Sequence, residues 1–322
     1  MGYRIGVDLG GTNMAAGVLN DAYEIVEFAT VKTRQGGSPE EIADDMTALV
    51  FSLMEKMGLT KEEVEIIGIG VPGSVTEDGI VEDANNINFY DVPFGTMMKE
   101  RTGMEIQMIN DARAAALGEY AAGAGKGSRT FQMVTIGTGV GGAFIVNGTA
   151  LGGCNGAAGE VGHMVIRQNG AKCTCGRRGC LEAYASAGAL KERMQKAVIE
   201  ERKRWPRSQE SILWELCSHR VEFLNGKTLF QALEQKDALA QNLFEEYIEY
   251  LAEGVANLIN ALQPDVLCIG GGMSEQKEKL LGPLRASVME KIYTKHSKVQ
   301  TRIVAAELGN DAGIIGAAYK MK

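Results

Sequence analysis

The most distinctive chemistry in this sequence lies in three cysteines, Cys173, Cys175 and Cys180, which fall within a stretch of eight residues. His163 lies ten residues before the first of them. Three thiolates and one imidazole complete the tetrahedral ligand set of a structural Zn²⁺, with no position left for water or substrate. The spacing therefore predicts a zinc site that stabilises a loop and takes no part in the reaction. Reduced thiols that bind nothing and a local disulfide remain the alternatives.

The other cysteines, Cys154, Cys217 and Cys268, are predicted to be ordinary core or loop residues. Six cysteines in 322 residues are too few for a disulfide-stabilised scaffold. The N-terminal residues also lack the apolar segment and the small-residue cleavage site of a secretory signal. We therefore expect a cytoplasmic protein.

Short glycine-rich segments give the second chemical signal. Two are expected at hairpin tips and a third follows a strand, and together they contain Gly10, Gly11, Thr12, Asn13, Gly137, Thr138, Gly139, Gly270, Gly271 and Gly272. Backbone N–H groups and a threonine hydroxyl at such tips bind phosphate oxygens. Asp8 precedes the first segment, where its carboxylate is placed to hold a hydrated Mg²⁺. Ordinary turn chemistry is the alternative for each segment alone, but the three together predict a nucleotide site.

Two familiar phosphate motifs are excluded by their context. Residues 137–142 read GTGVGG and match the dinucleotide-binding pattern G-x-G-x-x-G, but that pattern must open a helix. Here the apolar residues 143–146 and the Asn-Gly pair after them predict a strand and a turn. A Walker A motif also fails, because Tyr120 and Val221 stand where its first glycine is required.

The elements that position these residues fall into two similar halves. The first half predicts a hairpin, a helix with Ser38 as N-cap, Glu41 in a capping box and Gly58 at its end, two strands and an alanine-rich helix. These elements are expected at residues 3–9, 15–19, 39–57, 66–71, 105–109 and 112–122.

The second half opens in the same way, which indicates a duplicated α/β unit. We expect a second hairpin, a long amphipathic helix, a strand and a closely packed helix of small residues. These elements are expected at residues 131–136, 142–146, 239–262, 266–269 and 312–319. The polar segment 200–227 is interpreted as a solvated helix and loop, and its sequence assigns it no role.

The composition is that of a stable globular protein with an acidic surface. It is 45% hydrophobic and 23% charged, and its length predicts two domains. The chain carries 33 Lys and Arg against 41 Asp and Glu, and the net charge of −8 opposes nucleic acids and anionic membranes as partners. No apolar segment reaches the about 20 residues needed to span a bilayer.

Four segments resemble the ROK family (repressor, open reading frame, kinase), within the actin- and hexokinase-like ATPases. They are DLGGTN at 8–13, TIGTGVGG at 135–142, PDVLCIGGGMS at 264–274 and LGNDAGIIGAA at 308–318. The resemblance covers nearly the whole chain. It implies an α/β protein with two RNase H-like (actin-like ATPase) domains that face a central cleft, and a small structural zinc site. The expected domain bounds are 1–118, with the C-terminal helix 308–322 packing back on it, and 119–307.

The resemblance changes the interpretation of Asp111. From its position at a strand-to-helix junction alone, Asp111 is best interpreted as a helix N-cap. However, Asn110 and Asp111 match the sugar-binding and catalytic pair of the family. The resemblance therefore implies that both bind the sugar and that Asp111 is the base that takes the proton from its hydroxyl during phosphoryl transfer.

Further sugar-binding residues are implied by the resemblance alone. Glu160, His163 and Glu182 match family residues that hold sugar hydroxyls, and carboxylates suit adjacent diols because each accepts two hydrogens. If one ring nitrogen of His163 binds zinc, the other is free to meet a hydroxyl. Asn86 is expected to join them, although residues 85–89 depart from the family's usual Pro-Asn-Leu pattern with a following Trp.

The implied activity is ATP-dependent phosphorylation of a hexose, with glucose and its 6-hydroxyl as the first expectation. ATP, Mg²⁺ and a structural Zn²⁺ are the implied cofactors. N-acetylmannosamine kinase and fructokinase of the same family are the alternatives. A sugar-responsive repressor is disfavoured, because a strand over residues 3–9 leaves no room for an N-terminal helix-turn-helix and the charge opposes DNA. A homo-oligomer, expected to be a dimer, completes the prediction.

Overall fold

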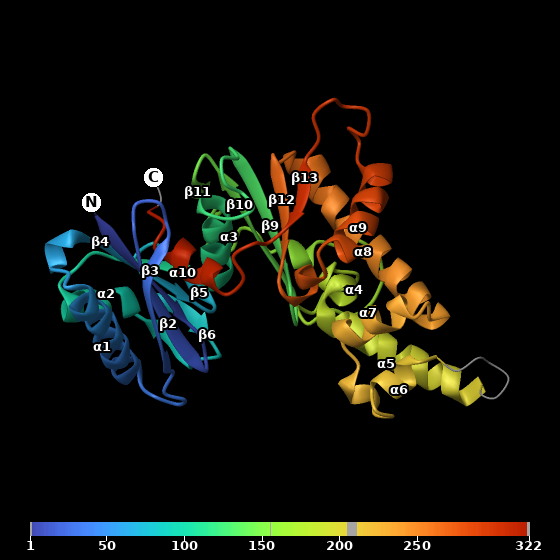
Figure 1. Cartoon of the computed structure of the whole chain (residues 1–322), viewed down its shortest axis with the longest axis horizontal. Helices are drawn as coiled ribbons and strands as arrows, with labels where there is room; N and C mark the ends of the chain where they lie inside the picture. The colour runs from blue at the N-terminus through green and yellow to red at the C-terminus, as the bar shows by residue number, and fades with distance from the viewer. Residues whose placement is uncertain (1, 155, 205–210, 321–322) are drawn as a thin grey trace. The chain divides into compact units, whose positions relative to one another are not determined.

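Figure 1 shows the computed structural model of the chain, which describes residues 2–154, 156–204 and 211–320. Its residues group into two compact units. Unit 1 comprises Met1–Met133, Gly142–Gly159 and Ala306–Lys322, and unit 2 comprises Val134–Gly141 and Glu160–Ala305. The domain bounds expected from the sequence, 1–118 with 308–322 and 119–307, stay a prediction. Among the described helices, none combines the length and the apolar character that crossing a membrane requires.

Unit 1 contains a five-stranded sheet with the order β3-β2-β1-β4-β8. Its strands are β1 (Tyr3–Leu9), β2 (Asn13–Leu19), β3 (Ile25–Lys32), β4 (Val64–Val71) and β8 (Ile106–Asn110). β1, β2 and β3 pair antiparallel, whereas β1, β4 and β8 run parallel. Parallel strands place their carboxyl ends at one edge of a sheet. Asp8 near the end of β1 and Asn110 at the end of β8 therefore lie at the same edge.

Helices cover both faces of this sheet (Figure 1). One face packs against α1 (Pro39–Met57) and α2 (Phe94–Thr102), and the other against α3 (Asp111–Ala121) and α10 (Asp311–Ala317). α1 has the predicted capping box between Ser38 and Glu41, and it ends at Gly58 with a left-handed φ of 65°. The apolar face of α1 packs into the core of unit 1.

Glycines let α10 lie directly against α3. A Cβ on Gly316 would collide with the backbone oxygen of Ala114, and one on Gly118 would collide with that of Ala312. Backbone is in contact with backbone at these positions, so neither glycine can be replaced without moving a helix. The close packing expected for the C-terminal small-residue helix is therefore confirmed.

The second five-stranded sheet repeats the order of the first, as β11-β10-β9-β12-β13. Its strands are β9 (Thr130–Ile136), β10 (Val140–Val146), β11 (Thr149–Ala150), β12 (Val266–Gly270) and β13 (Arg302–Ala305). In both sheets a hairpin supplies the middle strand and its neighbour, and a later strand pairs on the other side. The duplicated α/β unit predicted from the sequence is confirmed.

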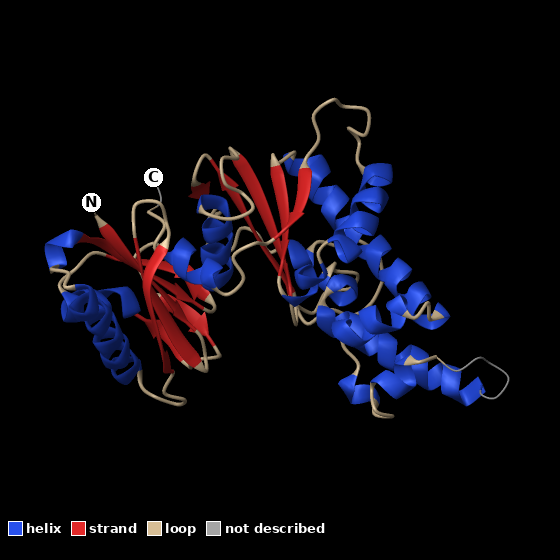
Figure 2. Ribbon diagram, viewed as in Figure 1, coloured by secondary structure: helices blue, strands red, loops and turns tan. Residues whose placement is uncertain are grey.

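Helices pack beside β9 and β12 to form the core of unit 2 (Figure 2). They are α5 (Ala187–Arg204), α7 (Gly226–Glu234), α8 (Ala238–Leu262) and α9 (Glu278–Lys291). The shorter elements of the chain are β5 (Ser74–Val75), β6 (Val81–Ala84), β7 (Phe89–Val92), α4 (Glu182–Ala185), α6 (Leu213–Leu216), and the 3₁₀ helices η1 (Lys61–Glu63), η2 (Val161–His163), η3 (Val221–Phe223) and η4 (Gly272–Gln276).

The elements expected from the sequence are all present, with ends displaced by at most two residues. The segment 200–227 begins inside α5, where the Arg202 guanidinium lies 4.3 Å from the centre of the Trp214 ring. This contact gives the basic run a packing role. The interpretation of the whole segment as solvated is wrong, because Leu213, Cys217 and Leu224 are buried in the core of unit 2. Residues 205–210 lie outside the described part of the chain.

Candidate active site

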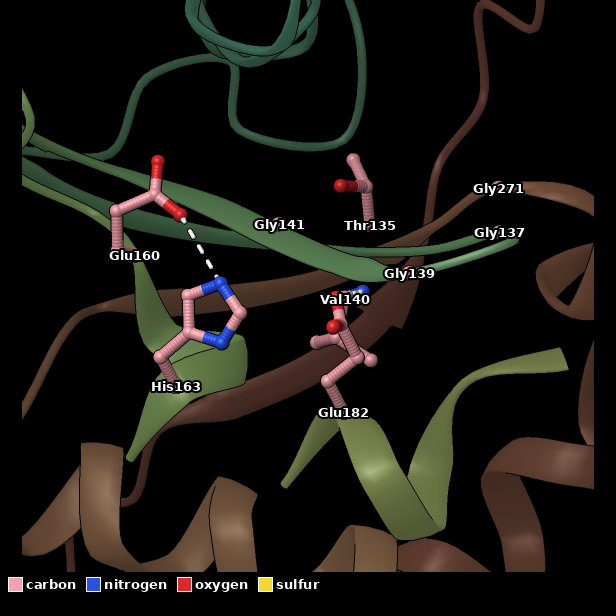
Figure 3. A pocket seen from close by; sticks show the side chains of 9 residues that line it. All are labelled: Thr135, Gly137, Gly139, Val140, Gly141, Glu160, His163, Glu182 and Gly271. Atoms are coloured by element: carbon pink, nitrogen blue, oxygen red, sulfur yellow. Dashed lines mark hydrogen bonds and ion pairs between the residues drawn. The ribbon is translucent and has the colours of Figure 1, made fainter. Parts of the chain in front are cut away.

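A cavity of about 360 Å³ in unit 2 brings together residues that the sequence assigns to different tasks (Figure 3). It is lined by Thr135, Gly137, Gly139, Val140, Gly141, Glu160, His163, Glu182 and Gly271. Glycines predicted to bind phosphate and side chains expected to hold sugar hydroxyls therefore share one cavity. We refer below to residues 137–141 as the glycine loop and to residues 171–180 as the metal loop.

Glu160 and His163 lie next to each other in this cavity, and Glu160 Oε2 is 4.0 Å from His163 Nε2 (Figure 3). The Glu160 side chain is 65% exposed, so both of its oxygens remain available to a ligand. The imidazole belongs to η2, and its other nitrogen faces the metal loop. These two side chains are therefore arranged to accept and donate hydrogen bonds to a polyhydroxylated ligand.

Glu182 is held from two directions at the start of α4. Its Oε2 accepts the backbone N–H of Val140 at 3.1 Å. Its Oε1 accepts the Thr174 hydroxyl at 2.9 Å, and the Cys173 thiol lies 3.6 Å from the same oxygen. The carboxylate thus contacts both the glycine loop and the metal loop.

The glycine loop turns tightly, with the Gly137 N–H donating to the Gly139 oxygen at 3.0 Å. The Gly137 oxygen accepts the N–H of Ala187, at the start of α5, at 2.9 Å. A Cβ on Gly139 would collide with Glu182 Oε2, whereas one on Gly137 would meet nothing within 4 Å. Gly271 has a left-handed φ of 82°, which glycine adopts without strain. Different physical constraints therefore apply at Gly137, Gly139 and Gly271.

The four predicted zinc ligands converge, because the donor atoms of His163, Cys173, Cys175 and Cys180 lie within 4.8 Å of one another. The sulfurs of Cys175 and Cys180 are 3.7 Å apart, and His163 Nδ1 is 3.6 Å from the Cys173 sulfur. Tetrahedral ligands at the usual Zn–S distance of about 2.3 Å would have sulfurs about 3.8 Å apart. The donor set therefore fits Zn²⁺, whereas a disulfide requires sulfurs about 2.0 Å apart.

The protonation of these thiols differs within the cluster. Burial raises the pKa of Cys180 to about 12. A hydrogen bond from the Arg177 backbone lowers the pKa of the exposed Cys175. A thiolate at Cys180 requires a cation beside it, which is what a bound metal supplies. Of the cysteines outside the cluster, Cys217 and Cys268 are buried and Cys154 is exposed.

In unit 1, the loop between β1 and β2 is closed by its own backbone and by one side chain. The Gly10 N–H donates to the Asn13 oxygen at 3.0 Å. Thr33 supports the loop twice, because its hydroxyl donates to the Gly10 oxygen at 2.6 Å and its N–H donates to the Thr12 oxygen at 3.0 Å. Thr12 and Asn13 remain exposed and available to a ligand.

The segment that carries Asn86 touches this loop. A Cβ on Gly11 would lie 2.9 Å from the backbone oxygen of Asn86, so only glycine leaves room for it. The Asn86 side chain is exposed. The structure therefore places the backbone of Asn86 beside the loop at residues 10–13, despite the atypical sequence around it.

Asn110, rather than Asp111, is the N-cap of α3. The Asn110 Oδ1 accepts the N–H of Arg113 at 3.2 Å, and its Nδ2 donates to the Gly73 oxygen at 2.9 Å. Asp111 is the first residue of the helix, and its Oδ1 accepts the Ala112 N–H at 2.7 Å and the Asn110 Nδ2 at 3.0 Å. The N-cap interpretation of Asp111 is therefore wrong, because the residue before it does the capping.

The carboxylates of unit 1 lie in an unfavourable electrostatic environment. Burial, and then the negative charge of Asp111, raise the pKa of Asp8. Loss of hydration raises the pKa of Asp111 as well, even though it accepts two hydrogen bonds and solvent reaches its side chain. The ionised pair lacks a cation among the described side chains that contact it. Such an arrangement favours the binding of a proton or a metal ion.

A model of the ROK family matches residues 4–322 of the chain. The chain belongs to the ROK family. A glucokinase from Thermotoga maritima is 36% identical over 321 residues, which cover 99% of this chain and 96% of that protein.

Solved structures of the ROK family match over similar lengths. A ROK glucokinase from Streptomyces griseus, in complex with glucose and AMPPNP, is 34% identical with a TM-score of 0.76 and covers 98% of each chain. A ROK hexokinase from Thermus thermophilus is 29% identical with a TM-score of 0.80 and covers 99% of this chain and 97% of that one. The α/β fold described above is therefore that of the ROK sugar kinases, of the actin-like ATPase type.

The predicted ROK site residues divide between the units. Unit 1 carries Asp8, Gly10, Gly11, Thr12, Asn13, Asn86, Asn110 and Asp111, and unit 2 carries Gly137, Thr138, Gly139, Glu160, His163, Cys173, Cys175, Cys180, Glu182, Gly270, Gly271 and Gly272. Sequence reasoning missed Thr33 and Thr174, which hold these residues in place. Thr33 gives no local signal, whereas Thr174 lies between two predicted metal ligands and was detectable there.

Proposed function

We propose that this protein transfers the γ-phosphoryl group of ATP to the 6-hydroxyl of glucose. The observation that carries the proposal is the cavity of unit 2, in which a glycine loop suited to phosphate adjoins Glu160, His163 and Glu182. The Streptomyces griseus relative, whose structure contains glucose and AMPPNP, supports the same pair of ligands for this chain. The full-length similarity to a glucokinase supports glucose over the other hexoses.

The residues of unit 1 supply the base in this proposal. Asp111 takes the proton of the sugar hydroxyl, and its raised pKa brings it closer to neutrality, where a general base is most effective. Asn110 fixes the Asp111 carboxylate through its Nδ2, and Asn110 and Asn86 also bind the sugar. Most of the acceleration comes from positioning, because phosphoryl transfer needs little further covalent chemistry from the protein.

The phosphates would be held by backbone N–H groups of the loops at 10–13, 137–139 and 270–272. Asp8 would hold a hydrated Mg²⁺, and its raised pKa fits a carboxylate that awaits a cation. Bound Mg²⁺ neutralises charge on the phosphates.

A zinc ion in the metal loop would be structural. The four donors His163, Cys173, Cys175 and Cys180 fill a tetrahedral shell, so no ligand position is left for substrate. His163 would bind through Nδ1, which faces the thiols, and its Nε2 would remain on the cavity side beside Glu160. Zinc occupancy and sugar affinity are therefore expected to change together.

A coupled ADP-release assay across glucose, mannose, fructose, N-acetylglucosamine and N-acetylmannosamine tests the substrate. We expect the highest kcat/KM with glucose. Preference for N-acetylmannosamine or fructose would replace glucose by the corresponding alternative within the family. Sugar binding without ADP release from any member of the panel would contradict the kinase and favour a binding or regulatory protein.

A further inference from the structure

Thr174 occupies an unexplained position inside the metal loop. It stands between two predicted ligands, Cys173 and Cys175, yet its hydroxyl turns to Glu182 Oε1 at 2.9 Å. The other oxygen of the same carboxylate accepts the N–H of Val140 at 3.1 Å. One carboxylate therefore joins the metal loop to the glycine loop, which are 34 residues apart between Val140 and Thr174.

Two side chains of the metal loop approach Glu182 Oε1. The Cys173 thiol lies 3.6 Å from this oxygen, whereas the Thr174 hydroxyl donates to it at 2.9 Å. An S–H group is a weak donor, and an O–H group at 2.9 Å is at the ordinary hydrogen-bond distance. The Thr174 hydroxyl is therefore the main donor from the metal loop to Glu182 Oε1.

The glycine loop is built to receive this carboxylate. A Cβ on Gly139 would collide with Glu182 Oε2, so the absence of a side chain at Gly139 allows the contact with Val140. By comparison, a Cβ on Gly137 would meet nothing within 4 Å, which leaves that position open toward the cavity. Gly139 thus leaves room for the Glu182 carboxylate, whereas Gly137 borders open space.

We propose that Thr174 is the positioning residue for Glu182, and that through Glu182 it links the metal loop to the backbone of the glycine loop. The inference rests on the proposed function, in which Glu182 meets sugar hydroxyls and the glycine loop meets phosphate. A hydroxyl that engages Glu182 competes with the Val140 N–H for carboxylate oxygen. Sugar binding and metal occupancy therefore both alter the glycine loop without contact with the nucleotide.

The test compares Thr174→Val, Thr174→Ser and Thr174→Ala with the zinc-loaded wild type. Loss of a hydrogen bond to a charged group is expected to raise the sugar KM of Thr174→Val and Thr174→Ala about tenfold. Thr174→Ser keeps the hydroxyl and is expected to restore KM to within about threefold of wild type. Thr149→Val, which makes the same change at an exposed site outside the cavity, is the matched control.

Two further readouts separate positioning from a general structural defect. Zinc content per chain is expected to be unchanged in Thr174→Val, whereas hydrogen–deuterium exchange in a peptide covering residues 137–141 is expected to increase. Chelation of zinc from the wild type should increase exchange in the same peptide. A Thr174→Val protein with wild-type sugar KM and wild-type exchange in this peptide would overturn the inference, and so would a serine variant as defective as valine.

Failure of the proposed function gives a different result. If the wild type transfers no phosphoryl group, sugar affinity measured by calorimetry replaces KM. Hydrogen–deuterium exchange in residues 137–141 still reports on the connection between Thr174 and the glycine loop through Glu182. Sugar affinity and loop exchange unaffected by Thr174→Val would then overturn the inference independently of the activity.

Discussion

The loop at 10–13 in unit 1 and the glycine loop at 137–141 in unit 2 follow equivalent strands but have different supports. The first loop is held by Thr33 from the end of the neighbouring strand, so its shape is fixed within one sheet. The second loop is held by Glu182 and by the start of α5. The two similar sheets therefore carry similar loops whose hydrogen-bond supports differ.

The carboxylates near the two loops differ in the same way. Asp8 and Asp111 have raised pKa values because burial is poorly compensated, and Asp8 also feels the charge of Asp111. Glu182 instead accepts donors at both oxygens. The carboxylates of unit 1 thus favour binding of a cation or a proton. Glu182 instead fixes the positions of the Val140 N–H and the Thr174 hydroxyl. The following predictions test this contrast.

The largest effect is expected from Asp111→Ala. Loss of a general base lowers kcat by about 10²- to 10⁴-fold, while sugar contacts in unit 2 persist. Steady-state kinetics and calorimetric sugar binding measure the two effects separately. Asp111→Asn keeps the shape of the side chain and serves as the matched control for packing. Turnover within a few-fold of wild type in either variant would remove Asp111 from this role.

Removal of the proposed zinc should act on unit 2. Chelation releases His163 and the thiols, and loss of this support for Glu160 and Glu182 is expected to weaken sugar binding about 10-fold or more. Sugar affinity before and after chelation, with zinc added back as a control, measures the effect. Unchanged affinity in a protein verified to be metal-free would show that the metal loop does not support the sugar site.

Alanine at the two glycines of the second loop should have different consequences. Gly139→Ala displaces Glu182, so we expect a several-fold increase in sugar KM. Gly137→Ala meets no protein atom and is expected to raise the KM for ATP while sparing that for sugar. Kinetics with each substrate varied in turn distinguishes them. Equal effects of the two variants on both substrates would argue against separate roles.

The smallest effect is expected in the pH dependence of the thermal stability of an Asp8→Asn variant. The raised pKa of Asp8 means that its protonated form stabilises the fold, and this contribution is lost as pH rises through the raised pKa. Asp8→Asn should therefore raise Tm at pH 7 by about 2–4 °C, and the gain should disappear near pH 4. Thermal unfolding at both pH values tests this, with the exposed Asp78→Asn as control. A lower Tm of Asp8→Asn at pH 7 would contradict the sign.

Sequence reasoning located elements with strong local signals and missed those without them. The capping box at Ser38 and Glu41 defined α1 to the residue. β3 was missed because its pattern is misleading: Val26 and Phe28 face solvent at 42% and 45% exposure, so apolar residues do not mark the buried side.

The candidate site shows the same limit. The cluster of His163, Cys173, Cys175 and Cys180 was predictable because the spacing of these residues is itself the signal. The glycine loops were predictable because they follow apolar strands. Position alone favoured Asp111 rather than Asn110 as the N-cap of α3, because both residue types cap helices and their order does not decide between them. The contact between Val140 and Glu182 was not predictable, since a backbone N–H carries no sequence signature.

The proposed phosphoryl transfer is tested most directly by following the label of [γ-³²P]ATP into sugar, with wild type and Asp111→Ala side by side. We expect the wild type to yield glucose labelled on its 6-oxygen, and Asp111→Ala to bind glucose but to transfer label at least about 100-fold more slowly. Labelled inorganic phosphate without labelled sugar, label on another glucose oxygen, or an Asp111→Ala protein as fast as wild type would contradict the proposed transfer.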